Sequence, residues 1–129
     1  MRLLDAVKYR LPLAGIVSIL HRASGLLMFV LLPFIVWLFD TSISSEISYE
    51  AFASAFLVGV AGVPGWAVKI VVLALIWAFL HHLIAGVRHV WMDATHSVSK
   101  EHGRQSAVIT LAASLLLTVA LGAKLFGLY

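Results

Sequence analysis

The chain contains no cysteine and few charged residues. Of its 129 residues only 12% are charged, 62% are hydrophobic, and the mean hydropathy is +1.04. Without cysteine, the chain cannot form a disulfide, ligate an iron–sulfur cluster or carry out thiol chemistry. A soluble domain has about 25% charged residues, so this composition indicates an integral membrane protein instead.

The small charge excess does not indicate a nucleic-acid-binding protein. Nine basic and six acidic residues give a net charge of +3, and the positive charges are scattered along the chain. Because nucleic-acid binding needs a clustered basic surface, membrane lipid is the expected partner and nucleic acid is not. The first ten residues mix charges with apolar side chains, which argues against a cleavable signal peptide.

Three long uncharged stretches approach the roughly 20 residues that are needed to cross a bilayer. We predict an all-α membrane protein with one domain, residues 1–129, and three transmembrane helices at roughly 15–39, 66–88 and 105–125. Pro33 lies inside the first helix, where it predicts a kink. Between the first two helices, residues 40–45 predict a polar loop and residues 49–60 a short interfacial helix.

The basic residues predict the orientation of these helices. Seven precede the core of the first helix or lie between the second and third, namely Arg2, Lys8, Arg10, Arg22, Arg88, Lys100 and Arg104. The other side has only Lys69 and Lys124. The positive-inside rule therefore places the N-terminus in the cytoplasm. With no transit peptide visible, we expect a multi-pass protein of a bacterial inner membrane.

A histidine doublet, His81-His82, lies near the end of the second predicted helix. Ionisable groups are costly in lipid and usually face a partner or a cofactor, and imidazole binds transition metals well. At helical spacing His82 shares a face with Gly86 and His89, which Asp93 extends. A glycine on that face leaves room for a flat ring or another helix. Spacing alone does not decide which histidine of the doublet binds a ligand.

A second polar cluster, at the same predicted depth, begins the first helix. Ser18, Arg22 and Gly25 share a face there. Each residue also has a simpler interpretation. Arg22 and Arg88 could extend to lipid headgroups, Ser18 could bond to its own helix, and His89 could be solvated.

Two motifs carry a resemblance to a known family. They are Ser18-x-x-His21-Arg22-x-Ser24-Gly25 and His82-x3-Gly86-x-Arg88-His89-x3-Asp93. In this order, in a chain with three predicted transmembrane helices, they resemble the cytochrome b subunit of succinate dehydrogenase, the larger membrane anchor of respiratory complex II. The resemblance extends from about Arg10 through the third predicted helix.

The resemblance implies roles for individual residues. His82 would be an axial ligand of haem b, with the other axial ligand supplied by the partner anchor subunit. Ser18 and Arg22 would line the ubiquinone site, and His21 and Arg22 would lie near the haem propionates. The candidates for structural or proton-pathway roles are His81, Arg88, His89 and Asp93.

The implied function is that of a membrane anchor in succinate:ubiquinone oxidoreductase, a complex of the tricarboxylic acid cycle and the respiratory chain. Such a subunit docks the flavoprotein and iron–sulfur subunits, shares haem b with a second hydrophobic anchor subunit in a heteromeric helical bundle, and has no catalytic activity alone. Two alternatives remain open: an anchor of the fumarate reductase type, and a haem-free anchor or small transport subunit in which His82 is a packed polar residue.

Overall fold

The computed structural model describes residues 13–95 and 100–128, with the side chains of residues 100–102 excepted. Arg2, Lys8 and Arg10, which contribute to the predicted orientation, lie outside these ranges. The described part comprises α2 (Leu13–Val30), α3 (Leu32–Ser44), α4 (Glu46–Leu57), β1 (Gly59–Val60), β2 (Val63–Pro64), α5 (Gly65–Thr95) and α6 (Lys100–Leu125). The predicted all-α class is confirmed.

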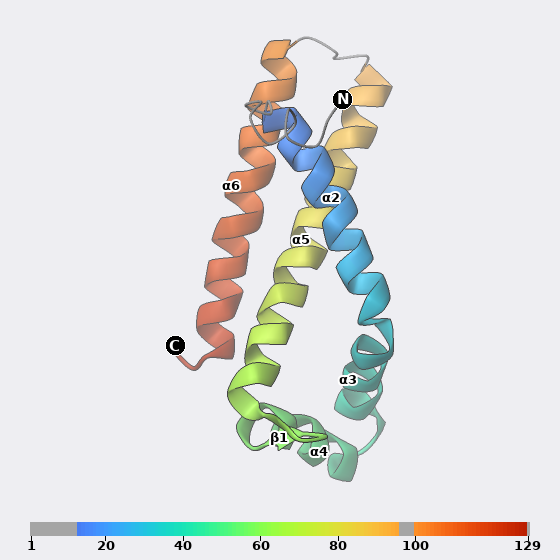
Figure 1. The fold of residues 1–129 in the computed structure, drawn as a ribbon, viewed down its shortest axis with the longest axis vertical. Helices are drawn as coiled ribbons and strands as arrows, with labels where there is room; N and C mark the ends of the chain where they lie inside the picture. Colours follow the sequence, from blue (N-terminus) through green and yellow to red (C-terminus); the bar gives the residue numbers. More distant parts are fainter. Residues whose placement is uncertain (1–12, 96–99, 129) are drawn as a thin grey trace, which may run out of the picture.

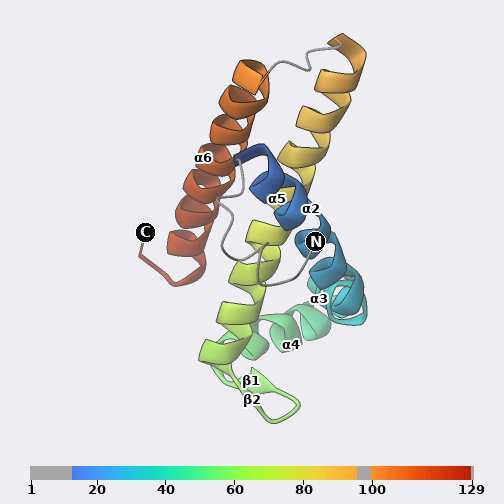
Figure 2. The ribbon, with the colours of Figure 1, turned by 45° about the horizontal axis from the view of Figure 1, so that its top comes forward.

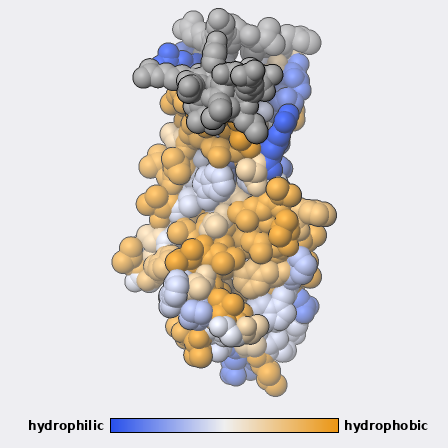
Figure 3. All heavy atoms as spheres, viewed as in Figure 1, coloured by the Kyte–Doolittle hydropathy of each residue, from blue (hydrophilic) through white to orange (hydrophobic). Residues whose placement is uncertain are grey.

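Three of the described helices are long and apolar enough to cross a membrane, over Leu13–Val30, Gly65–Thr95 and Gly103–Leu125. Helix α5 has 31 residues, which corresponds to about 46 Å at 1.5 Å per residue. It is therefore longer than predicted, and longer than a hydrocarbon core of about 30 Å. Apolar side chains cover much of the face drawn in Figure 3, with hydrophilic ones nearer its two ends.

Helix α5 packs along both α2 and α6 (Figures 1 and 2). The beginning of α2, the end of α5 and the beginning of α6 lie at one end of the molecule, here called the polar end. Near this end the three helices meet at Val17, Ala85 and Ala107, which are almost completely buried. Small side chains at such a meeting point allow the helix backbones to approach closely.

The first predicted transmembrane helix is divided in two. Helix α2 ends at Val30 and α3 begins at Leu32, with Pro33 in its first turn. Because proline has no backbone N–H and crowds the preceding turn, the helix axis changes direction here, and α3 leads toward the end opposite the polar end (Figure 1). Backbone hydrogen bonds from Leu31 N to Leu27 O (3.1 Å) and from Ile35 N to Leu31 O (3.0 Å) continue across the junction. The predicted kink is confirmed.

The predicted polar loop at residues 40–45 is wrong, because α3 continues to Ser44. Hydroxyl groups in this stretch donate to carbonyl groups one turn earlier, as Thr41 does to Trp37 O (2.7 Å). Such local bonds let polar residues remain in a helix. Only Ser45 is extended, and its side chain and that of Ser48 cap α4 reciprocally.

Helix α4 matches the short helix expected near residues 49–60, and a tight hairpin follows it. Strands β1 and β2 pair antiparallel, with Gly59 opposite Pro64 and Val60 opposite Val63. Gly59 has φ of 116°, a conformation that favours glycine. The hairpin turns the chain directly into α5, so this end of the molecule serves to connect the helices.

Candidate functional site

The two members of the histidine doublet lie in different surroundings. His81 is completely buried, and its ring stacks on Trp77 with the centroids 5.2 Å apart. Within the described residues, neither ring nitrogen of His81 has a hydrogen-bond partner. His82 is partly exposed and lines an open groove. A ligand from outside the chain could thus approach His82 and not His81.

Helix α2 holds the ring of His82. The Nδ1 atom of His82 lies 3.0 Å from the carbonyl oxygen of His21. Because a carbonyl oxygen can only accept a hydrogen bond, Nδ1 must carry the ring proton in the neutral imidazole. The Nε2 atom then keeps its lone pair, which is the arrangement of a metal-binding histidine whose other nitrogen donates to a backbone carbonyl.

The ring of His21 lies flat against that of His82, with the centroids 4.1 Å apart and the planes at 12°. Two glycines border this contact between the helices, and only Gly25 is too close to its neighbour to accept a Cβ atom without a shift. A Cβ atom at Gly25 would lie 2.9 Å from Cε1 of His82, and one at Gly86 would lie 3.6 Å from Nε2 of His21. The glycines of the two motifs therefore each face the histidine of the other helix.

A groove of about 530 Å³ runs beside His82. Apart from His21 and His82 its lining is apolar, and comprises Leu83, Gly86, Val87, Val90, Trp91 and Ala94. The described residues contain no group of three or more His, Cys, Asp or Glu side chains that could hold a bare metal ion. The residues present do fit a haem, because a flat apolar macrocycle needs one imidazole nitrogen from this chain and an apolar wall.

A smaller, polar cavity of about 230 Å³ lies between α2 and α5 on the other side of His21. Its polar lining comprises Ser18, His21, Arg22, Arg88 and His89. Among the described residues that line it there is no carboxylate group, so these residues offer hydrogen-bond donors and positive charge. Ser18 and Arg22 are exposed in the isolated chain, which leaves them available to a ligand or to another subunit.

Arg88 does not extend freely into solvent. Its Nε donates to Ser106 Oγ (2.9 Å) and its Nη2 donates to the carbonyl of Gly103 (3.2 Å). Both acceptors belong to the first turns of α6, so one side chain links the end of α5 to the beginning of α6. Planar guanidinium donors suit this kind of fixed, two-point contact.

His89 and Asp93 form an exposed pair at the polar end. Their Nε2 and Oδ2 atoms are 3.5 Å apart, and their side chains are 75% and 73% exposed. A pair this exposed contributes little to stability. Both groups remain accessible to water or to a partner subunit.

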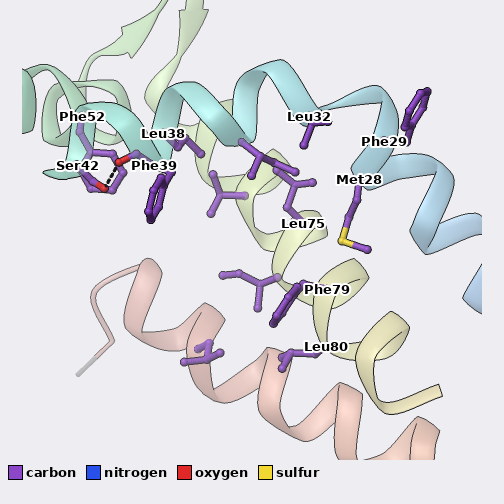
Figure 4. A pocket seen from close by; sticks show the side chains of 14 residues that line it. Met28, Phe29, Leu32, Leu38, Phe39, Ser42, Phe52, Leu75, Phe79 and Leu80 are labelled. Atoms are coloured by element: carbon purple, nitrogen blue, oxygen red, sulfur yellow. Dashed lines mark hydrogen bonds between the residues drawn. The ribbon is translucent and has the colours of Figure 1, made fainter. Parts of the chain in front are cut away.

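A larger apolar cavity, of about 800 Å³, lies between the α2–α3 kink and α5 (Figure 4). Its lining includes Phe29, Phe39, Leu75 and Phe79. Among the described residues of the lining Ser42 is the one with a hydroxyl or charged group, and its hydroxyl donates to the carbonyl of Phe39 (2.8 Å). The described lining therefore offers no titratable side chain for proton chemistry.

The structure brings together most of the residues that the two motifs single out. His21, Arg22 and Ser18 on α2 meet His82, Arg88 and His89 on α5. Sequence reasoning missed the contacts of Ser24 and Gly25 with the His82 ring. Both residues belong to the first motif, but nothing in a single sequence shows which residue across the bundle they touch.

The chain is similar to known proteins over most of its length. The family model for the succinate dehydrogenase/fumarate reductase transmembrane subunit matches residues 4–121. A succinate dehydrogenase cytochrome b556 subunit of Paracoccus denitrificans is 34% identical over 111 residues, which cover 86% of this chain and 80% of the relative. The protein of the same description from Coxiella burnetii is 33% identical over 119 residues, covering 92% and 90%. The chain therefore belongs to the family of succinate dehydrogenase and fumarate reductase transmembrane subunits.

Proposed function

We propose that this chain is the cytochrome b membrane anchor of a succinate:ubiquinone oxidoreductase, and that His82 is its axial ligand to haem b. The observation that carries this proposal is the contact between Nδ1 of His82 and the carbonyl of His21, which leaves Nε2 unprotonated. The open apolar groove beside His82 supports it. A haem bound there would supply a one-electron redox centre within the membrane.

The second axial ligand would come from a second hydrophobic anchor subunit. The lining of the groove supports this proposal. Among the described residues it contains two histidines, and the ring of His21 is stacked on that of His82 rather than placed across the groove from it as a second ligand. Leu83, Val87, Val90 and Trp91 along the groove are all exposed in the isolated chain. A partner helix that covered them would complete a heteromeric bundle around the haem.

Quinone reduction would use the polar cavity. Ser18 would donate a hydrogen bond to a ubiquinone carbonyl, and Arg22 would stabilise negative charge that develops on a quinone oxygen during reduction. Arg22 and His21 would also pair with the anionic haem propionates. The donors and positive charge that the described lining of this cavity offers support both roles.

Reduction of the quinone consumes protons as well as electrons. Oxidation of succinate to fumarate releases two electrons and two protons, and reduction of a quinone to a quinol takes up two of each. We place the polar end in the cytoplasm, on the basis of the positive charges. There the exposed His89 and Asp93 could exchange protons with water, and the flavoprotein and iron–sulfur subunits would dock. In this assignment the membrane is a bacterial inner membrane.

A matched pair of substitutions tests the haem assignment. In the purified complex, His82→Leu should abolish the reduced-minus-oxidised b-type spectrum, because no other described histidine on the groove has its ring proton fixed by a backbone carbonyl. His81→Leu, one residue away but inside the bundle, should retain it. The opposite pattern would transfer the ligand role to His81. A complex of the unsubstituted chain without a b-type spectrum would eliminate the haem proposal and favour a haem-free anchor.

A second pair of assays tests the quinone assignment. Ser18→Ala and Arg22→Ala should lower quinone reduction while succinate oxidation by an artificial electron acceptor stays at its original rate. Leu83→Ala, on the other groove, serves as a control that should affect quinone reduction less. If both Ser18→Ala and Arg22→Ala reduce quinone at the original rate, the polar cavity is not the quinone site.

An anchor working in the fumarate-reducing direction is the second candidate. The matching family description covers both succinate dehydrogenase and fumarate reductase, whereas the relatives from Paracoccus denitrificans and Coxiella burnetii are both described as succinate dehydrogenase subunits. Direction depends on the redox potentials of the centres and the quinone, which side chains alone do not determine. Measuring both reactions with ubiquinone and with menaquinone separates the two.

A further inference from the structure

Ser24 is a buried serine with an unusual pair of contacts. It lies on α2, one turn after His21, and its side chain is completely buried. Its hydroxyl donates to the carbonyl oxygen of His21 (2.8 Å), and its Oγ lies 3.3 Å from Nδ1 of His82. Ser24, the His21 carbonyl and the His82 ring therefore form a closed triangle of polar contacts between two helices.

The direction of each hydrogen bond in this triangle follows from the number of protons available. A serine hydroxyl has one hydrogen, and the shorter contact assigns it to the His21 carbonyl. The Oγ atom can then only accept from His82. Both atoms that face Nδ1 are acceptors, so the single N–H of the ring is shared between them in a bifurcated hydrogen bond.

We propose that Ser24 is a positioning residue for His82, one that fixes the plane of its imidazole ring and the side that carries the proton. The inference rests on the proposed role of His82 as haem ligand. With one acceptor the ring could rotate about its Cβ–Cγ bond and still keep a hydrogen bond. Two acceptors on one side, the stacked His21 ring and the close backbone of Gly25 leave a single orientation.

A positioning role has consequences that a purely structural role lacks. Hydrogen bonding to the non-ligating nitrogen changes the basicity of an axial imidazole and so tunes the metal that it binds. The plane of that imidazole relative to the second axial ligand also determines the electron paramagnetic resonance (EPR) signal of an oxidised low-spin haem. Ser24 should therefore influence the spectroscopic signature and the midpoint potential without touching the haem.

The chain offers a closely matched control. Ser114 on α6 is also completely buried, and its hydroxyl likewise donates to the carbonyl three residues earlier, Leu111 O, at 3.1 Å. In the described part of the chain its hydroxyl makes no hydrogen bond to a histidine ring. Ser24→Ala and Ser114→Ala thus remove the same atom and the same local bond, and differ in the contact with His82.

The experiment compares the two variants in the purified, haem-loaded complex. In Ser24→Ala, the low-field EPR line of the oxidised haem should shift or broaden and the midpoint potential should move, whereas Ser114→Ala should match the parent. If the complex with Ser24→Ala does not assemble, Ser24→Cys is used in its place. The cysteine fills the site with a weakly hydrogen-bonding thiol, so the EPR line and the midpoint potential should shift in this variant too. Signals of Ser24→Ala or Ser24→Cys identical to those of the parent would overturn the positioning role.

The haem proposal fails separately from this inference. If His82→Leu keeps the full b-type spectrum, His82 is not the ligand and the basis of the Ser24 role is lost. If His82→Leu loses that spectrum and the Ser24 variants match the parent, the haem proposal stands and the role of Ser24 alone is refuted.

Discussion

Replacing Gly25 by alanine should displace the His82 ring from its place on α2. A Cβ atom there would lie 2.9 Å from Cε1 and 3.2 Å from Nδ1 of His82. Nonbonded carbon atoms in favourable contact are about 3.5–4.0 Å apart, so the ring must retreat by about 0.5–1 Å. A retreat of that size would stretch or break the 3.0 Å contact between Nδ1 and the His21 carbonyl.

The expected cost of Gly25→Ala combines three effects. Overpacking a tight contact costs about 1–3 kcal/mol, and losing the hydrogen bond adds about 0.5–1.5 kcal/mol. Alanine returns up to about 1 kcal/mol through its higher helix propensity. We therefore expect a net destabilisation of roughly 1–3 kcal/mol, with the b-type spectrum weakened or altered.

Thermal unfolding of the purified complex and its reduced-minus-oxidised spectrum measure these two effects. Gly103→Ala is the control, because no described residue outside its own stretch of helix lies within 4 Å of the added methyl group. Gly86→Ala is a second comparison, since its Cβ would make an ordinary 3.6 Å contact with His21. If Gly25→Ala unfolds at the temperature of Gly103→Ala with an unchanged spectrum, His82 is not held as described.

Three further predictions concern the surroundings of this site. Arg88→Gln and Ser106→Ala should each lower the unfolding temperature. Because the two residues share one hydrogen bond, the decrease in the double variant should be smaller than the sum of the two single decreases. A decrease equal to that sum would show that this bond is not formed. Asp93→Asn should leave the unfolding temperature nearly unchanged, since its pair with His89 is largely exposed; a large decrease would reveal a partner that buries the pair. His81→Leu should unfold at the same or a higher temperature, because it removes a buried imidazole without a hydrogen-bond partner among the described residues; a clear decrease would mean that the imidazole has one in the assembled complex.

Composition and hydrophobic length predicted the number of membrane-crossing helices. Pro33 predicted the kink because its effect on a helix is local and does not depend on neighbours. The boundaries were less predictable. Serine and threonine at residues 41–44 suggest a loop by composition, yet their hydroxyl groups bond within the helix and extend α3.

Helical periodicity predicted which residues share one face of a helix, but not which residues of another helix they contact. It placed His82 and Gly86 on one side of α5, and Ser18 and Arg22 on one side of α2. It could not show that Gly86 faces His21, because that contact depends on how the two helices cross. The choice between His81 and His82 also depended on the position of the neighbouring helices, which bury the first and leave the second on a groove.

Within the described residues, the hydrogen-bond partners of the His82 side chain belong to α2, whereas His82 itself belongs to α5. Its proton placement and ring orientation are therefore absent from either helix alone and arise when the two associate. Assembly of this helix pair should accordingly precede capture of any ligand that needs the free Nε2. Substitutions that loosen α2 from α5 at a distance, for example at Val17 or Ala85, should then reduce loading of the site even though they leave every ligating atom in place.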